Sequence, residues 1–263
     1  MKKIMVILSK EWLEIRQQRL LLFSILLPPL IFSLLPLGVI YSIGLTGANS
    51  TNSNMPSGLN NLTVLAGMSP KEVVEALIGM QLSNLFLLLP GIITSIVASY
   101  SIVGEKTSRT LEPLLATPIR TWELLLGKSL ASLLPGVGVT WLSGLIFIIG
   151  VYLLTASQRV FLAIVSPGWL ILFLVWAPLL SLIAIAVMIA ISSRVNDPRT
   201  AQQLSVWIVV PFLGVFIGQA AGLQVLGPVF TLIVAAVLAV IALVAMWGTT
   251  ILFQREVILT RWK

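Results

Sequence analysis

Six apolar runs of about the length that crosses a lipid bilayer dominate this chain. An α-helix needs about 20 apolar residues to cross a hydrocarbon core of about 30 Å. Only 10% of the residues are charged, which is too few to cover a water-soluble globule of this size. The sequence therefore predicts an all-α polytopic membrane protein with six transmembrane helices, at 20–45, 81–103, 129–154, 169–193, 204–221 and 229–253.

The distribution of lysine and arginine predicts how the chain is oriented. Fourteen of the sixteen basic residues lie at the N-terminus, between the second and third runs, between the fourth and fifth, or in the C-terminal tail. Only Lys71 and Arg159 fall on the other side. Because cytoplasmic loops are enriched in lysine and arginine, both termini of this multi-pass protein are expected on the cytoplasmic side of the cell membrane. Topology and anionic lipid then explain the net charge of +7 better than nucleic acid does.

Residues 1–19 differ from a signal peptide, because their basic and acidic residues are interleaved and no cleavage site follows. We expect an amphipathic helix in the cytoplasmic interface, followed by a single six-span domain over residues 20–263. The alternative is that these residues are the cytoplasmic end of a long, tilted first span. The helix would have an apolar face and a polar face, formed by Ile4, Leu8, Trp12 and Ile15 and by Lys3, Lys10, Glu14 and Gln17.

A polar segment of residues 46–80 separates the first two runs and is expected outside the cell. Within it, Ser69 is a good helix cap, Pro70 suits the first helical position, and Glu72 completes a capping box. The pattern predicts a short external helix that ends near Ala76.

The six runs contain no Asp, Glu, Lys or Arg, and the whole chain contains no His or Cys. Proton-coupled transporters usually need an ionisable group within the membrane. Intramembrane hydrolases need an activated nucleophile or metal ligands. We therefore expect no catalytic residues, no metal site and no cofactor in this chain, and no enzyme activity of its own.

The polar residues inside the runs are neutral, and two interpretations fit them. Hydroxyl and amide groups form hydrogen bonds between helices in lipid, so they can hold the bundle together. Alternatively, they line a path for a substrate, and the second run is the better candidate because it holds most of them. The residues concerned are Gln81, Ser83, Asn84, Thr94, Ser95, Ser99, Ser205 and Gln219.

The segment between the second and third runs, GEKTSRTLEPLLATPIRTWELLLGK (104–128), is charged and predicted to be helical. Leu111, Leu114 and Leu115 lie at helical spacing, and Pro118 ends this helix. A second short helix, 121–126, then leads into the third run. Leucines displayed between charged residues are typical of a docking surface for another protein. A solvated loop that packs on its own helix ends is the alternative.

This segment resembles the signature of permease subunits of ABC transporters, and more narrowly of their type-2 export family. Arg109 departs from the pattern, which usually has glycine there, and residues 196–203 give a weaker match. The resemblance implies that the segment is a coupling helix that inserts into a groove of a separate ATP-binding subunit. The matching residues are Glu105, Thr110, Leu111, Glu112, Leu114, Leu115, Ala116, Thr117, Pro118, Glu123, Gly127 and Lys128.

The phosphate-binding pattern G-x-x-x-x-G-K-[ST] is missing from the sequence. Gly127-Lys128-Ser129 comes nearest, but Trp122 stands where the first glycine would be. ATP and magnesium are therefore expected on a partner subunit.

The resulting prediction is the permease subunit of an ATP-driven exporter. It would pair with a second copy or a sister subunit and with two ATP-binding subunits. The uncharged spans favour an apolar or amphipathic cargo. The docking contact would be formed by Leu111, Leu114 and Leu115, oriented by Glu105, Arg109, Glu112 and Arg120, with Thr110, Ala116 and Pro118 in the same segment. A membrane anchor for an ATPase and an ATP-independent channel or carrier are the alternatives.

Overall fold

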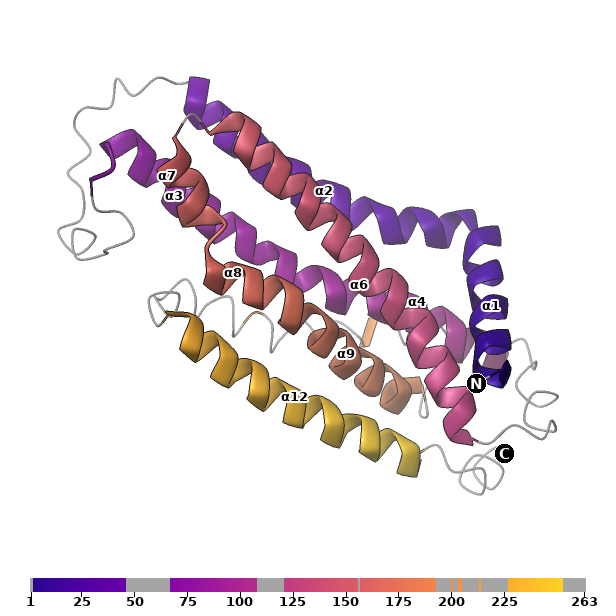
Figure 1. Cartoon of the computed structure of the whole chain (residues 1–263). Coiled ribbons are helices and arrows are strands. Elements are labelled where there is room, and N and C mark those ends of the chain that lie inside the picture. Colours follow the sequence, from indigo (N-terminus) through magenta and orange to yellow (C-terminus); the bar gives the residue numbers. More distant parts are fainter. Residues whose placement is uncertain are drawn as a thin grey trace.

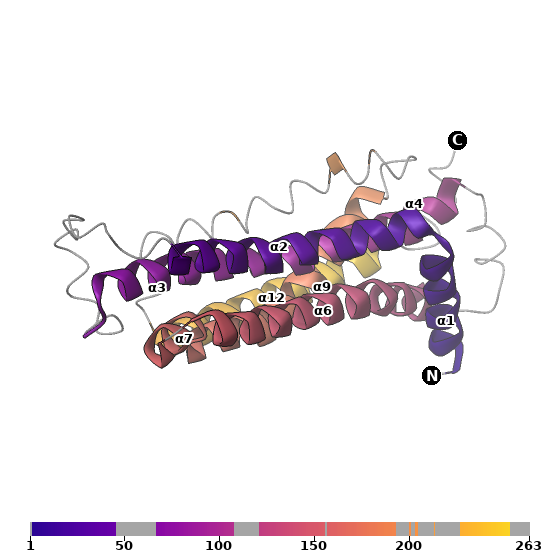
Figure 2. The same cartoon turned by 90° about the horizontal axis from the view of Figure 1, so that it is seen from above.

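The computed structural model describes residues 2–45, 67–107, 121–155, 157–192, 200, 203–204, 213 and 227–252. The regular structure in these ranges is helical. Five segments of the described chain are long and apolar enough to cross a membrane, and they lie side by side in an elongated bundle (Figures 1 and 2). The predicted all-α polytopic class is confirmed.

Three helices correspond to single predicted runs, namely α2 (Arg19–Leu45), α6 (Thr121–Leu154) and α12 (Gly227–Leu252). Helix α6 begins at Thr121, so the short helix expected at 121–126 is the first part of α6. The predicted fifth run, 204–221, lies outside the described residues except for Leu204 and Leu213.

The second predicted run is part of a longer helical series, α3 (Pro70–Ser83), the 3₁₀ segment η3 (Asn84–Leu87) and α4 (Leu88–Thr107). The predicted capping box is confirmed, because Ser69 N–H donates to Glu72 Oε2 at 2.7 Å and Glu72 N–H to Ser69 Oγ at 3.4 Å. The expected helix end near Ala76 is wrong. No proline follows Pro70 before Pro90, so nothing in the sequence breaks the helix where it enters the membrane.

The fourth predicted run is preceded by helix α7 (Gln158–Ile164) and begins earlier than expected, at α8 (Pro167–Ile171). Ser166 caps α8 by accepting a hydrogen bond from the N–H of Trp169 at 3.3 Å. The π-helical segment η4 (Leu172–Trp176) then leads into α9 (Ala177–Ser192). In Figure 1, α9 ends at the opposite end of the bundle from the start of α12.

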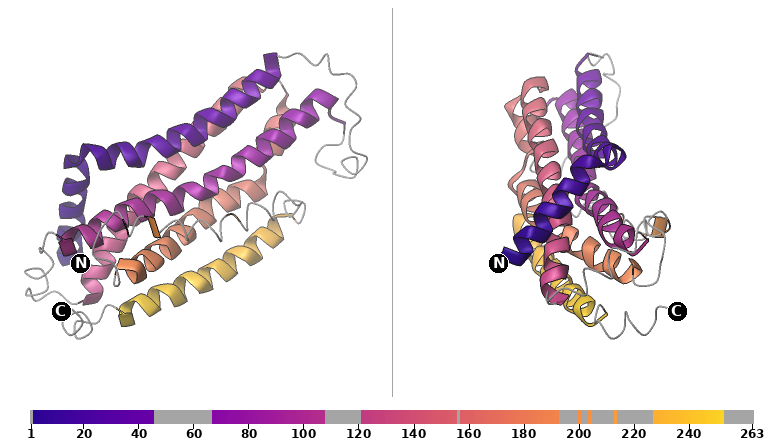
Figure 3. Two further views of the ribbon diagram at one scale, coloured as in Figure 1. Left: turned by 180° about the vertical axis from the view of Figure 1, so that it is seen from behind. Right: turned by 90° about the vertical axis from the view of Figure 1, so that its right-hand side faces the viewer.

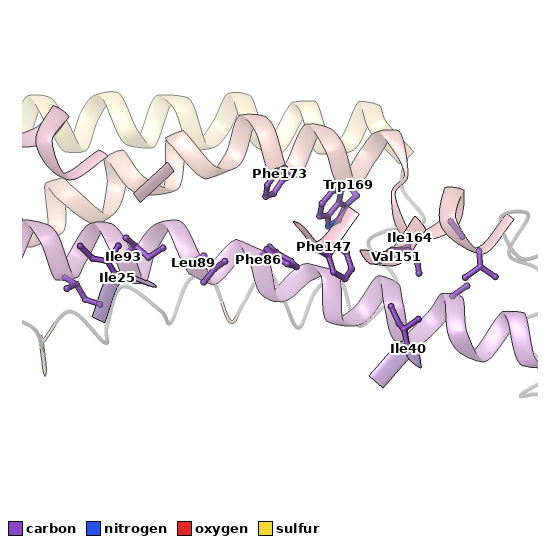
Figure 4. Close-up of a cluster of buried hydrophobic side chains, with 14 of the residues drawn as sticks. Ile25, Ile40, Phe86, Leu89, Ile93, Phe147, Val151, Ile164, Trp169 and Phe173 are labelled. Atoms are coloured by element: carbon purple, nitrogen blue, oxygen red, sulfur yellow. The ribbon is translucent and has the colours of Figure 1, made fainter. Parts of the chain in front are cut away.

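An aromatic cluster forms the centre of the core, where η3 and η4 meet (Figure 4). The rings of Trp169 and Phe173 are stacked with their centroids 5.0 Å apart. The ring centroid of Phe86 lies 5.0 Å from that of Phe147 on α6. Gly144 of α6 leaves the space that the Phe173 ring fills, since a β-carbon there would overlap the ring. Apolar burial does not drive helix association in lipid, so this close packing is what holds the helices in place.

Candidate functional site

Helix α1 (Lys2–Gln17) turns sharply away from α2 at Gln18 and lies across one end of the bundle (Figure 3). The end of α4 at Thr107 and the start of α6 at Thr121 lie at the same end (Figure 1). These two helix ends flank the predicted docking segment, so α1 lies beside the base of that segment.

Most of the predicted docking residues lie outside the described residues. Glu105 is the exception, and it is part of the last turn of α4. Both helices that lead into the segment are continuous with membrane-crossing helices. The predicted docking residues that are not described are Arg109, Thr110, Leu111, Glu112, Leu114, Leu115, Ala116, Pro118 and Arg120.

A buried ion pair joins three helices at the base of this segment. The ammonium group of Lys128 on α6 donates to Glu11 Oε1 of α1 at 2.9 Å. It also donates to the carbonyl oxygen of Ser101 on α4 at 2.8 Å and to Ser101 Oγ at 3.2 Å. Lys128 is 3% exposed and Glu11 is 2% exposed. Since an ammonium group has three donors, these contacts satisfy Lys128 completely.

The packing of α1 on α6 explains why this charge is buried. Ile7 lies directly against Gly127, where a β-carbon would come within 2.8 Å of Ile7 Cγ2. Lys128 belongs to the charged segment 104–128 of the sequence, and the structure buries it because α1 folds over it. On α1, Ile7 and Glu11 are the buried positions, while Trp12 is exposed and open to a lipid interface.

Several predicted path residues take part in packing. Thr94 Oγ1 donates to Ser181 Oγ of α9 at 3.1 Å, whereas the hydroxyls of Ser83, Ser95 and Ser99 donate to carbonyls of their own helix series. Gln81 is half-buried on α3. Ser205 and Gln219 lie outside the described residues. The described path residues thus lie along one helical series.

Asn84 differs from the other predicted path residues. Its side chain is 1% exposed, and neither amide atom has a hydrogen-bond partner among the described residues. It is the first residue of η3, one residue after the Ser83 carbonyl that accepts from Trp169 Nε1 at 3.3 Å. An unsatisfied buried amide costs about 1–3 kcal/mol, so its presence in the bundle calls for an explanation.

Comparison with protein families gives a match over most of the chain. The family model described as ABC-2 family transporter protein matches residues 5–232. This range includes most of α1, the ion pair, the predicted docking segment and the second run. Comparison with curated proteins finds no match.

Proposed function

Because the chain belongs to the ABC-2 family of transporter proteins, we propose that it is the membrane-spanning permease subunit of an ATP-driven exporter. It works as a dimer, with a second copy or a sister subunit, and two separate ATP-binding subunits dock on its cytoplasmic side. The family match over residues 5–232 is the observation that carries this proposal.

The need for a separate ATPase is supported by the place of the sequence that comes nearest to a phosphate-binding loop. Gly127, Lys128 and Ser129 lie inside α6, and Lys128 is held by Glu11 and Ser101. A phosphate-binding loop instead follows a strand and presents backbone N–H groups and its lysine to the phosphates. This triplet therefore serves helix packing, and ATP and magnesium bind to the partner.

The docking segment is proposed as the site where ATP-driven force enters the bundle. Leu111, Leu114 and Leu115 supply the apolar contact, and the charges around them orient the ATP-binding subunit. The support is the position of the flanking helices, since α4 and α6 run from this segment through the bundle. Displacement of the segment would thus act directly on membrane-crossing helices.

The cargo is proposed to be apolar or amphipathic, and its path to follow the second run. The described segments that could cross a membrane carry few charged residues. Lys128, which is buried near the start of α6, is neutralised by its ion pair with Glu11. Asn84, with its unsatisfied amide, is the proposed polar contact for cargo in this path. An amphipathic molecule offers the donor or acceptor that such an amide requires.

The test is isolation of the tagged chain from its native membrane in mild detergent, followed by identification of the proteins that accompany it. We expect an ATP-binding subunit, and the reconstituted complex should move amphipathic dyes across liposomes only with ATP. A complex that hydrolyses ATP but moves no solute would favour a membrane anchor. Solute movement by the chain alone, without nucleotide, would favour a channel or carrier.

A further inference from the structure

We propose that Lys128, Glu11 and Ser101 form a pin that makes α1 move as one body with the base of the docking segment. Through this pin, displacement of the segment by the ATP-binding subunits also moves α1 and the start of α2. The inference rests on the proposed function and adds positioning residues to it. The pin is defined by the three hydrogen bonds of the Lys128 ammonium group.

The pin lies close to both ends of the docking segment. Lys128 is about two turns after the start of α6 at Thr121, and Ser101 is about two turns before the end of α4 at Thr107. Any shift of the segment that moves these helix ends therefore reaches the pin within about 10 Å of helix. Glu11 is the contribution of α1, two turns before the bend at Gln18.

The chemistry of the contact explains why it would transmit motion. Apolar side chains slide past one another at little cost, as long as contact area is preserved. A buried ammonium group that loses its carboxylate partner becomes an uncompensated charge, which is strongly unfavourable. The ion pair therefore permits one relative position of α1 and α6, which the packing of Ile7 against Gly127 alone would not hold.

The bend at Gln18 connects this movement to α2. Gln18 takes part in the backbone hydrogen bonds of both helices, since Gln18 N–H donates to the Glu14 carbonyl at 3.2 Å and Leu22 N–H to the Gln18 carbonyl at 3.1 Å. Helix α1 is thus joined to α2 through a single residue, without a flexible linker, so a movement of α1 is passed on to the start of α2. The exposed side chains at the start of α2, Leu20 and Phe23, leave one face of this helix without packing partners in the described chain.

The first experiment removes the pin but keeps its volume, with the double variant Glu11→Leu/Lys128→Met. Replacing both partners of a buried pair by apolar residues is tolerated far better than removing one. The complex with the ATP-binding subunits should still assemble. Permease-stimulated ATP hydrolysis should fall at least fivefold, because force at the segment no longer reaches α1.

A distance measurement gives a readout that a merely structural role would not change. The chain has no cysteine, so Leu13→Cys on α1 and Tyr152→Cys on α6 can carry a unique pair of spin labels, diluted with unlabelled copies. Both positions are exposed, at 57% and 69%. The distance between them should be the same with and without trapped ATP in the pinned chain. In the double variant it should shift or broaden when ATP is trapped.

A second variant tests the pin without disturbing the ion pair. The disulfide variant Ile7→Cys/Gly127→Cys links α1 to α6 at a point where the two β-carbons would lie 3.0 Å apart. Because β-carbons joined by a disulfide usually lie about 3.5–4.5 Å apart, α1 must move outward by a fraction of an ångström as the bond forms. If α1 and α6 move together, the oxidised variant should hydrolyse ATP at the same stimulated rate as its own reduced form.

The outcomes separate the pin from the proposed function. Loss of stimulated hydrolysis on oxidation of Ile7→Cys/Gly127→Cys would overturn the pin, because α1 must then move relative to α6. Full stimulation and an unchanged distance in Glu11→Leu/Lys128→Met would also overturn it. If the wild-type complex shows no stimulated hydrolysis at all, the proposed function itself fails and the pin fails with it.

Discussion

Thr94 Oγ1 of α4 donates a hydrogen bond to Ser181 Oγ of α9 across 3.1 Å, and both residues are completely buried. Gly136 of α6 lies against the same hydroxyl, with no room for a β-carbon. Three membrane-crossing helices therefore meet at Thr94. Small residues and hydroxyl groups at such a point let helices in lipid approach closely.

Replacing Thr94 by Val should destabilise the bundle modestly. Valine keeps the shape of threonine but removes the hydrogen bond to Ser181, and such bonds in membrane bundles are worth about 0.6 kcal/mol on average. Thermal unfolding in detergent should show a lower midpoint. Ser99→Ala is the matched control, because the Ser99 hydroxyl donates to the Ile96 carbonyl of its own helix, and it should change the midpoint less. Equal shifts would contradict an interhelical role for Thr94.

Gly136→Ala should destabilise far more than Gly138→Ala. A β-carbon at Gly136 would overlap Thr94 Oγ1, whereas one at Gly138 would meet no heavy atom within 4 Å. Overpacking typically costs about 1–3 kcal/mol, so the unfolding midpoint of Gly136→Ala should fall while that of Gly138→Ala stays close to wild type. Similar behaviour of the two variants would show that α4 and α6 are not in close contact at this level.

Asn84→Leu should stabilise the protein and impair transport. Leucine has the same branched shape, with bulkier methyl ends, and removes the amide whose two polar atoms have no partner among the described residues, which should add up to about 1–3 kcal/mol to the free energy of unfolding. ATP-dependent movement of an amphipathic dye should fall if the amide contacts cargo. A lower unfolding midpoint would mean that Asn84 has a structural partner, and unimpaired transport would remove it from the path.

The orientation can be tested by labelling, since the chain has no native cysteine. A membrane-impermeant maleimide should label Gln158→Cys in intact cells, because Gln158 begins α7 on the side predicted to be external. Met5→Cys on α1 is 65% exposed and should react only after the membrane is permeabilised. The opposite pattern would invert the topology and place the docking segment outside the cell.

Hydropathy was sufficient to predict the class of the fold and several helix bounds, because a helix that crosses the bilayer must be apolar over the whole thickness of the hydrocarbon core. Local rules also predicted the cap at Ser69, where each residue acts on its immediate neighbours. The burial of Lys128 was not predictable in this way. It depends on α1 folding back over α6, and Glu11 is 117 residues away in the sequence.

The candidate path shows the same division between local and distant information. The sequence identified Thr94 and Asn84 as polar residues within a span. For each of them, a hydrogen bond between helices and the lining of a substrate path were open interpretations. Only the arrangement of α9 and α6 distinguishes them, since it gives Thr94 a hydrogen-bond partner in Ser181 and brings none to the Asn84 amide among the described residues. The sequence alone does not show which neighbouring helix a neutral polar residue in a span will face.

In the proposed mechanism, ATP hydrolysed by a separate subunit drives this bundle through the docking segment. Leu115 carries the apolar docking contact in this account, and an aspartate there would have to be desolvated in the groove of the partner. Leu115→Met, which keeps an apolar side chain of similar volume, is the matched control.

The most direct measurement compares permease-stimulated ATP hydrolysis and ATP-dependent dye movement for wild type, Leu115→Asp and Leu115→Met in liposomes. We expect Leu115→Asp to insert normally into the membrane but to lose both activities, while Leu115→Met retains them. Normal hydrolysis and transport by Leu115→Asp would contradict the proposed mechanism.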